Sequence, residues 1–377
     1  MSPEPPPRHA PGQRTSDFEY DLPPGLIAQQ PLPERSGSRL LVVRRLGGSA
    51  ARRLDGDAPS SAGEPPSRRA AEPPFEDRHF SDLASLIPPG DLLVLNSSKV
   101  RHARFVGTRP SGAPAEVLLI SPAHGERWIA IGQPGSALRP GKRIRIGREA
   151  FIETLAVRPD GYREVRFVGI SADEALRSLG QLPLPPYITR DPTVDDETRY
   201  QTVYAEREGS VAAPTAGLHF TSALLHKLES RGVQLAGLDL EVGPGTFKPV
   251  EVEDPARHPM HPEWFEIPQG TADRIEELRC RGGRLWAVGT TVVRALESAA
   301  TGGGRVSPTR AESRLLITPG FRFRVVDRLV TNFHLPRSTL LMLVAAFAGF
   351  ERTMAAYRHA VAAGYRFYSY GDAMVIL

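Results

Sequence analysis

The chain has 377 residues, of which 40% are apolar and 24% charged, as is usual for a soluble globular protein with two domains or one large domain with an insertion. Its single cysteine, Cys280, excludes an internal disulfide framework and a zinc site built from cysteines. The formal net charge of +4 and the sequence pI near 9.3 permit a partner that bears phosphates, without requiring one.

The first 14 residues are predicted to be a disordered extension. They contain proline and arginine but no apolar core, so they are not expected to act as a signal peptide. The longest apolar run, Leu340–Ala348, is far too short to span a membrane and suits a buried helix. We therefore expect a cytoplasmic protein without a membrane partner.

Short apolar runs predict buried strands at Leu40–Val43 and Leu92–Leu95. Between them, residues 47–74 are almost entirely small, polar, charged or proline, so this segment is predicted to be a flexible surface loop. From residue 101 to residue 168, short alternating runs are broken by glycine and proline without a helical period. Such close spacing predicts a small antiparallel β-barrel, inserted as a domain at residues 101–179.

After a stiff, proline-rich connector at Pro183–Tyr187, strands and helices alternate. This alternation is typical of α/β architecture, and it assigns residues 15–100 and 180–377 to one main domain. The strands are predicted at Gln234–Leu240, Arg284–Val288, Arg314–Ile317 and Arg328–Val330. The helices are predicted at Thr271–Arg281, at Thr290–Ser298, directly after a cap at Ser338, and at Thr353–Ala363.

The segment Val211–Thr221 is predicted to be a shaped turn, because a proline and a glycine inside it break both regular periods. It presents the hydroxyl of Thr215 and the imidazole of His219 just before a predicted helix. Polar groups that lead into a helix N-terminus favour anion binding and acid–base chemistry. The alternative is a tight turn whose threonine and histidine only satisfy backbone groups.

A second candidate anion site is the strand, glycine turn and helix at Val288–Ser298. Thr290 and Thr291 open the helix, where free backbone N–H groups and the helix dipole favour a carboxylate or a phosphate. Arg294 lies one turn further and could pair with the same anion. The alternative is an ordinary threonine-capped helix with a solvated arginine.

The segment Leu238–Phe247 joins a strand to a Gly-x-Gly turn at Gly243 and Gly245. This pattern resembles the first motif of Rossmann-type methyltransferases, in which the glycine turn leads into a helix that approaches the ligand. Pro249 opposes a helix at that point, and a third glycine is missing. A methyltransferase therefore stays as the alternative interpretation.

Three histidines, His258, His261 and His334, raise the question of a metal site. The first two stand among prolines and no third ligand cluster is near them in sequence, so no metal is predicted. Positioning, proton transfer or plain turn packing is expected for them instead. The segment Tyr368–Asp372 could stack on a flat base or a cation, although core aromatics are the default explanation.

Together these segments resemble one family, the S-adenosylmethionine:tRNA ribosyltransferase-isomerases of queuosine biosynthesis. The resemblance extends from about Asp17 to the C-terminus. Its carriers are Asp17-Phe18 with Leu26–Gln29, Gly90–Asn96, Leu182–Ile188, Arg199–Ala205, Gly209–Thr221, Val242–Val250, His258–His261, Ala287–Ser298, Thr331–Pro336, Ser338–Val344 and Tyr365–Met374. The chain departs from the family pattern at Ser97-Ser98, which stand in place of Asp-Thr, at Glu241 and Pro244, which stand in place of His and Leu, and at residues 47–74, where a short hairpin is usual.

The resemblance implies transfer and isomerisation of the ribosyl group of S-adenosylmethionine onto 7-aminomethyl-7-deazaguanine at the tRNA wobble position. The product is then epoxyqueuosine, with adenine and methionine released. It also implies a main α/β domain with a barrel-like β core surrounded by helices, a smaller inserted antiparallel β-barrel, and an active site between them. No metal or redox cofactor is implied, because S-adenosylmethionine is consumed as a substrate. The expected partners are S-adenosylmethionine and the tRNA, and we expect a monomer.

For this chemistry the predicted catalytic residues are His219, Thr215, Glu297 and Asp372. His219 would transfer a proton, whereas Glu297, Asp372 or Glu241 would balance the sulfonium charge or protonate adenine. A Rossmann-type S-adenosylmethionine-dependent RNA methyltransferase and a non-catalytic tRNA-binding module remain as alternatives from other classes.

Substrate contacts are predicted on the same basis. Thr290, Thr291 and Arg294 would hold the methionine carboxylate, and the rings of Phe220, Phe247 and Phe333 would stack on a base. The other predicted substrate-binding residues are Gly243, Gly245, Thr246, His258, His261, Asn332 and His334. The predicted contacts to tRNA phosphates are Lys99, Arg101 and Arg104, beside the junction with the inserted barrel.

Overall fold

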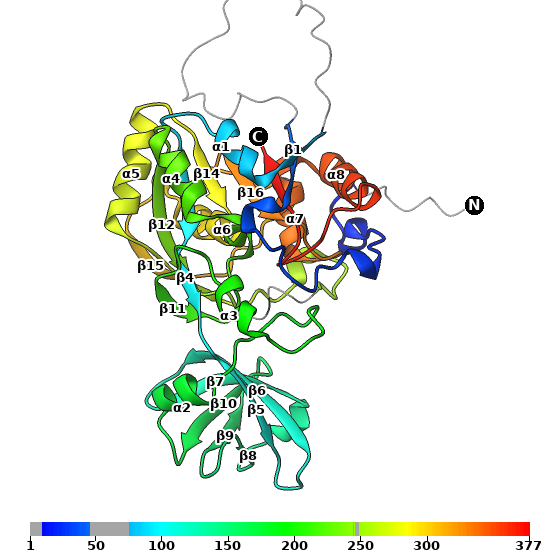
Figure 1. Ribbon diagram of the computed structural model, residues 1–377, viewed down its shortest axis with the longest axis vertical. Helices are drawn as coiled ribbons and strands as arrows, with labels where there is room; N and C mark the ends of the chain where they lie inside the picture. Colours follow the sequence, from blue (N-terminus) through cyan, green and yellow to red (C-terminus); the bar gives the residue numbers. More distant parts are fainter. Residues whose placement is uncertain (1–9, 46–74, 244, 246–248) are drawn as a thin grey trace, which may run out of the picture.

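The computed structural model describes residues 10–45, 75–243, 245 and 249–377. The loop predicted at 47–74 therefore lies outside the described residues. The described chain forms a larger α/β body and a smaller β-barrel below it in the view of Figure 1. The α/β class predicted from the sequence is confirmed.

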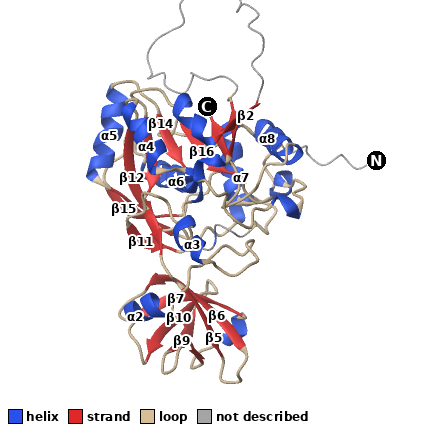
Figure 2. Ribbon diagram, viewed as in Figure 1, coloured by secondary structure: helices blue, strands red, loops and turns tan. Residues whose placement is uncertain are grey.

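Nine strands form the sheet of the body (Figure 2). In spatial order they are β15 (Thr309–Ser313), β13 (Glu263–Ile267), β12 (Gln234–Leu240), β3 (Leu92–Asn96), β14 (Leu285–Val288), β16 (Arg328–Asn332), β17 (Ala373–Ile376), β1 (Arg39–Val43) and β2 (Phe75–His79). The four central strands β12, β3, β14 and β16 are parallel, and both margins contain antiparallel pairs. Because β15 and β2 end the sheet instead of pairing with each other, the sheet is open. The barrel-like core predicted for the body is therefore wrong.

Helices cover both faces of this sheet. The α-helices of the described residues are α1 (Leu83–Leu86), α2 (Ala172–Ser178), α3 (Val194–Arg199), α4 (Ser222–Ser230), α5 (Gln269–Cys280), α6 (Thr290–Ala299), α7 (Thr339–Ala348) and α8 (Phe350–Ala362). Leu92 and Val94 of β3 face the core that α5 to α8 share, whereas Leu93 and Leu95 face the core shared with α1 and α4. Burial on both faces explains why these strands are continuous apolar runs in the sequence.

Six antiparallel strands close the smaller barrel. They are β5 (Arg104–Thr108), β6 (Pro114–Pro122), β7 (Arg127–Gln133), β8 (Arg143–Arg145), β9 (Phe151–Val157) and β10 (Arg163–Val168). Alternate residues of β6, namely Ala115, Val117 and Leu119, are buried in its interior, as a two-residue period requires. Domain limits at 101 and 179 stay a prediction.

The chain enters and leaves the barrel through a short junction. Strand β4 (Ser98–Val100) leads into β5 and pairs in parallel with β11 (Arg207–Ser210) of the returning chain. The proline-rich connector predicted at Pro183–Tyr187 lies on the return path. Below, the name connector covers Leu182–Ile188. A further contact joins the two parts, since the hydroxyl of Tyr162 lies 3.3 Å from Nδ1 of His261.

Two predictions about local structure need correction. The strand predicted at Arg314–Ile317 is wrong, because the strand is β15, just before it, where polar residues alternate along the sheet edge against β13. Residues 10–14 of the predicted disordered extension are in place, with the N–H groups of Gly12 and Arg14 donating to the Asp17 carboxylate. Among the described helices, no single one is long and apolar enough to cross a membrane, although α7 and α8, bent by 115°, reach that length and composition together.

Candidate active site

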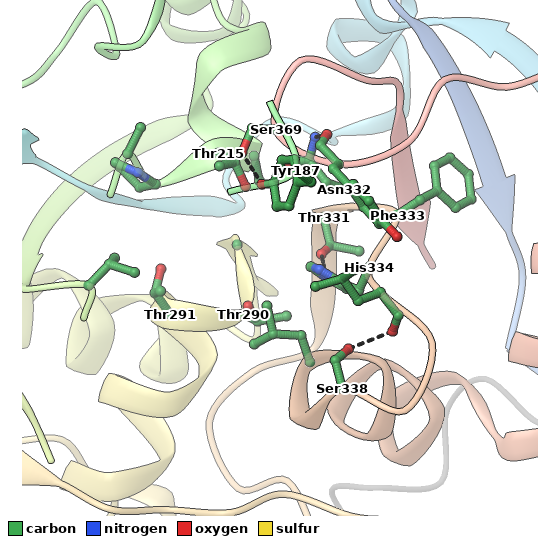
Figure 3. Close-up of a pocket in the computed structure, with 18 residues that line it drawn as sticks. Tyr187, Thr215, Thr290, Thr291, Thr331, Asn332, Phe333, His334, Ser338 and Ser369 are labelled. Atoms are coloured by element: carbon green, nitrogen blue, oxygen red, sulfur yellow. Dashed lines mark hydrogen bonds between the residues drawn. The ribbon is translucent and has the colours of Figure 1, made fainter. Parts of the chain in front are cut away.

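A cavity lies where parallel strands of the sheet end at their carboxyl edge (Figure 3). Its lining includes Val242 after β12, Gly289–Thr291 after β14, and Thr331–Leu335 at the end of β16. Crevices at this edge of open α/β sheets are the usual place for a ligand. The cavity therefore lies in the body, and its lining contains no residue of the barrel.

The N-terminus of α6 opens into this cavity. Gly289 has φ +94°, which brings the chain sharply from β14 into the helix, and no side chain caps the first turn. The first N–H groups of the helix are therefore available to a ligand. The hydroxyl of Thr291 is buried and has no hydrogen-bond partner within the described part of the chain. Together with the helix dipole, these groups suit a carboxylate.

Arg294, predicted to hold the same anion, does not line the cavity. Its Nη1 pairs with the buried carboxylate of Glu263 on β13, and its Nε donates to the carbonyl of Leu315 over 3.2 Å. The other oxygen of Glu263 accepts the N–H of Gly243 at 3.4 Å. Through Glu263, Arg294 therefore links α6 to the predicted Gly-x-Gly turn at Gly243 and Gly245, called the glycine bend below. The substrate contact predicted for Arg294 stays a prediction.

His219 is buried at the end of the 3-10 helix Thr215–His219 and does not line the cavity. Its Nδ1 lies 2.8 Å from the hydroxyl of Ser38, and its Nε2 lies 3.1 Å from the amide nitrogen of Asn332. That amide nitrogen also donates to the carbonyl of Tyr368 at 3.0 Å. We therefore assign Nε2 as an acceptor and Nδ1 as the protonated nitrogen that donates to Ser38.

The electrostatics of His219 agree with a neutral ring. Burial lowers its pKa to about 3, and the positive charges of Arg35 and Arg366 act in the same direction. Both nitrogens are engaged within the protein, and Nε2 holds the side-chain amide of Asn332. The catalytic role of His219 stays a prediction.

Asn332 and His334 carry the polar groups at the end of β16. With its amide nitrogen committed, the Oδ1 atom of Asn332 is a buried acceptor that has no partner among the described residues. The Nε2 of His334 lies 2.8 Å from the Thr331 hydroxyl, and burial lowers the pKa of His334 to about 3. Both residues line the cavity, so His334 is the imidazole nearest to a ligand there.

Two tyrosines form an aromatic side of the cavity. The ring centroids of Tyr187 and Tyr368 are 4.6 Å apart, and the Tyr187 hydroxyl lies 2.6 Å from that of Ser369 (Figure 3). Tyr368 has φ +71°, a strained conformation for a residue with a side chain. Tyr187 was missed as a site residue in the sequence, although the proline-rich connector that contains it was visible.

Two predicted aromatic contacts differ in their position. Phe333 lines the cavity, and its ring packs 5.0 Å from that of Phe367. The fully buried ring of Phe220 packs 5.0 Å from that of Phe80, and Phe220 does not line the cavity. Thr215 lines the cavity.

Two predicted catalytic carboxylates hold backbone segments in place. Glu297 accepts the N–H groups of residues 324–326 at 2.9 to 3.0 Å. Asp372 accepts those of Arg39 and Arg366 at 2.9 and 2.8 Å. Burial raises the pKa of both groups, and neither lines the cavity. The catalytic roles predicted for Glu297 and Asp372 stay predictions.

The glycine bend lies close to His261, one of the two histidines at His258–His261. A Cβ at Gly245 would come within 2.7 Å of the His261 ring, so this close approach requires glycine. Burial lowers the pKa of His258, and neither histidine lines the cavity. Within the described ranges, no group of three His, Cys, Asp or Glu could hold a metal ion. The predicted contacts Thr246 and Phe247 lie outside the described residues.

The predicted tRNA contacts follow the junction between β4 and β5. Lys99 pairs with Glu208 at 3.3 Å, and Arg104 pairs with Glu116 at 2.8 Å. Arg101 is nearly buried, and its guanidinium lies 5.4 Å from the ring centre of Trp128. Burial lowers the pKa of Arg101.

Comparison with known proteins shows which family the chain resembles. The family model described as "Queuosine biosynthesis protein" matches residues 15–57 and 67–376. An S-adenosylmethionine:tRNA ribosyltransferase-isomerase of Cupriavidus pinatubonensis is 49% identical over 361 residues, which cover 96% of this chain and 98% of that protein. One of Paraburkholderia xenovorans is 50% identical over 368 residues, which cover 96% and 97%.

A solved structure is similar over the whole chain. The crystal structure of an S-adenosylmethionine tRNA ribosyltransferase from Thermotoga maritima covers 96% of this chain and 99% of its own, with 36% identity and a TM-score of 0.51. The chain therefore belongs to the S-adenosylmethionine:tRNA ribosyltransferase-isomerase family.

Proposed function

We propose that this protein transfers and isomerises the ribosyl group of S-adenosylmethionine onto 7-aminomethyl-7-deazaguanine at the tRNA wobble position. Epoxyqueuosine is formed, and adenine and methionine are released. The observation that carries the proposal is the cavity at the carboxyl edge of the sheet. It combines an uncapped helix N-terminus, a buried amide acceptor and an aromatic side in a protein of this family of enzymes.

The N-terminus of α6 would hold the methionine end of S-adenosylmethionine. A carboxylate there would accept the N–H groups of the first helical turn and the hydroxyl of Thr291, which needs a partner. This anchoring would fix the sulfonium and the ribose C5′ relative to the rest of the cavity. The sulfonium makes the C5′ proton acidic, so a base near it can form an ylide.

The aromatic side and Asn332 would hold a base. Tyr187 and Tyr368 offer ring faces for adenine or the deazaguanine. The Oδ1 atom of Asn332 would accept an N–H of that base, and His219 would keep the amide in this orientation. Of the two imidazoles, His334 lines the cavity, so we propose that it takes the proton-transfer role first predicted for His219.

The size of the cavity sets a condition on binding. Its volume is about 50 Å³, well below the roughly 300 Å³ at the lower end for sites that enclose a drug-sized ligand. A carboxylate fits in this space, but a whole nucleoside does not. The lining must therefore separate when S-adenosylmethionine binds.

The fold bears on the methyltransferase alternative. In those enzymes the glycine turn after the strand leads into a helix. Here β12 ends before the glycine bend, and the chain later returns as β13, antiparallel to β12. The glycine bend is thus part of an antiparallel connection. A tRNA-binding module without catalysis remains the second alternative.

Chromatography of the small-molecule products separates the three functions. The full-length protein is incubated with S-adenosylmethionine and tRNA that carries the aminomethyl deazaguanine, with unmodified tRNA as the control. We expect equal amounts of adenine and methionine, formed only with the modified tRNA. S-Adenosylhomocysteine as the product would indicate a methyltransferase, and unchanged S-adenosylmethionine would indicate a binding module.

The proposal includes no metal or redox cofactor, because S-adenosylmethionine is consumed as the substrate. It also includes a monomer that acts in the cytoplasm. Light scattering coupled to size-exclusion chromatography tests the monomer, for which a mass near 41.1 kDa is expected.

A further inference from the structure

A second cavity, of about 470 Å³, lies between the barrel and the connector. The barrel contributes Arg104, Glu116, Leu118 and Ile131, and the connector contributes Pro183–Pro186 and Ile188. The reaction proposed above uses none of these side chains. The cavity is nevertheless much the larger of the two, and its size falls within the range typical of ligand pockets.

The same two segments of the chain separate the two cavities. On the connector, Tyr187 lines the first cavity, while its neighbours Pro186 and Ile188 line the second. On the chain before the 3-10 helix, Val211 lines the second cavity and Ala213 lines the first. Two residues span at most about 7 Å even when fully extended. The two cavities are therefore close enough for neighbouring parts of one ligand to occupy both.

The chemistry of the second cavity suits a flat group with polar edges. Prolines of the connector, with Leu118 and Ile131 opposite, provide apolar surfaces. Arg104 and Glu116, paired at 2.8 Å and both partly exposed, place donors and an acceptor together at the wall. A bare phosphate is a poor match, because Glu116 offsets the charge of Arg104. An unpaired nucleobase is a good match, because proteins bind unstacked RNA bases by stacking and by hydrogen bonds to their edges.

We propose that the second cavity binds an unpaired nucleotide of the tRNA that directly neighbours the modified one. The inference rests on the proposed function, since it takes the modified base to lie in the first cavity. The barrel then contributes to the choice of RNA, while the body carries the reaction. Recognition of the neighbour would let the enzyme distinguish tRNAs that present the same target base.

Binding of stem-loop RNAs tests this inference without relying on turnover. The probes are an anticodon stem-loop with the target base, and two versions with an abasic site on either side of it. Dissociation constants are measured by fluorescence anisotropy with the full-length protein at one fixed salt concentration. We expect one of the two abasic sites to weaken binding about tenfold, the size of effect that loss of one stacked base produces.

Variants that fill the second cavity with a larger side chain test whether the loss of affinity at the abasic site arises there. Leu118→Trp should weaken binding of the intact stem-loop about tenfold, and the sensitive abasic site should then cause no further loss. Val157→Trp is the matched control, because Val157 lies on β9 with 49% of its surface exposed and lines neither cavity. It should bind all three RNAs as the wild type does. Ile131→Phe is a second filling variant, in case Leu118→Trp does not fold.

The outcomes are distinct. Equal affinity of the wild type for all three RNAs overturns the inference, and so does an abasic penalty that is undiminished in a folded filling variant. The products of S-adenosylmethionine are measured separately at saturating RNA. If Leu118→Trp still releases adenine and methionine but no longer senses the neighbour, both proposals stand. If the wild type releases neither product yet senses the neighbour, only the proposed reaction fails.

Discussion

Two histidines of the candidate site are buried and neutral, and this makes them acid-sensitive elements of the fold. Burial lowers the pKa of both His219 and His334 to about 3. In the unfolded chain the same groups titrate near the ordinary value of about 6.5. The unfolded state therefore binds more protons between these values, so their contribution to stability is present above pH 6.5 and is lost as the pH falls toward 3.

The prediction concerns the slope of stability against pH. Between pH 6 and pH 4, His219 alone should lower the free energy of unfolding by up to about 1.4 kcal/mol per pH unit. His219→Gln should flatten the slope by about this amount, since an amide can still accept from Asn332 and donate to Ser38. Urea denaturation of the wild type and of His219→Gln at several pH values measures this slope. Parallel curves for the two proteins would contradict the assignment of a neutral, buried His219.

A second prediction at this scale concerns two hydroxyls of the same cavity. Thr291→Val removes a hydroxyl that has no described partner, so we expect an unfolding free energy that is unchanged or slightly higher. The KM for S-adenosylmethionine should rise about tenfold or more, because a hydrogen bond to a charged group contributes about 1.5–3 kcal/mol.

Ser338→Ala is the contrasting variant. The Ser338 hydroxyl already caps α7 by accepting the N–H of Leu341 at 3.2 Å. Its loss should lower stability by about 1 kcal/mol and leave the KM nearly unchanged. Steady-state kinetics and thermal melting of both variants provide the comparison. A Thr291→Val protein with wild-type KM would remove Thr291 from substrate binding.

The sequence predicted which residues line the cavity better than it predicted the contacts between their side chains. Thr215, Thr290, Thr291, Asn332 and His334 were all predicted, and all line the cavity. The sequence could not show that His219 contacts Ser38 and Asn332, which lie 181 and 113 residues away along the chain. These contacts depend on how the folded sheet brings distant segments together, so the sequence alone does not reveal them.

At the scale of elements, the sequence predicted best where the burial pattern is simple. The strand at Gln234–Leu240 has the predicted limits, and the helix α6 ends within one residue of its prediction. The edge strand β15 was missed because it is polar and alternates, while the apolar residues after it suggested a strand. The barrel was predicted from the close spacing of its short alternating runs.

The ion pair that joins α6 to β13 gives a prediction at this scale. Arg294 and Glu263 are both about 5% exposed, so removing the arginine breaks a buried ion pair while the Glu263 carboxylate stays buried. Arg294→Met should lower the free energy of unfolding by about 3–5 kcal/mol. The control is Arg207→Ala, which removes an arginine that is 64% exposed and pairs with Glu266 and Asp239, and it should lower the free energy of unfolding far less. A stable Arg294→Met protein with a raised KM for S-adenosylmethionine would instead restore Arg294 as a substrate contact.

At the scale of the whole molecule, the basic junction between body and barrel is the predicted contact for RNA phosphates. Lys99→Ala combined with Arg101→Ala should weaken tRNA binding and reduce the slope of log affinity against log salt by about one to two. Arg281→Ala, directly after α5, where the side chain is 62% exposed, is the control and should leave the slope unchanged. An unchanged slope in the double variant would exclude Lys99 and Arg101 from the interface.

The arrangement of the whole molecule was only partly visible in the sequence. A body and an inserted barrel could be predicted from the change in strand spacing after residue 100. The open sheet could not, because strand order depends on pairings between segments that are remote along the chain. The first cavity also lies within the body rather than between the two parts, which places the barrel beside the proposed reaction rather than around it.

The central claim is that the N-terminus of α6 holds the carboxylate of S-adenosylmethionine. A crystal structure of the protein with S-adenosylmethionine bound tests it most directly. The account predicts the carboxylate within hydrogen-bond distance of the first N–H groups of α6 and of the Thr291 hydroxyl, with the base beside Tyr187 and Tyr368. A ligand bound elsewhere, with the end of α6 untouched, would contradict it.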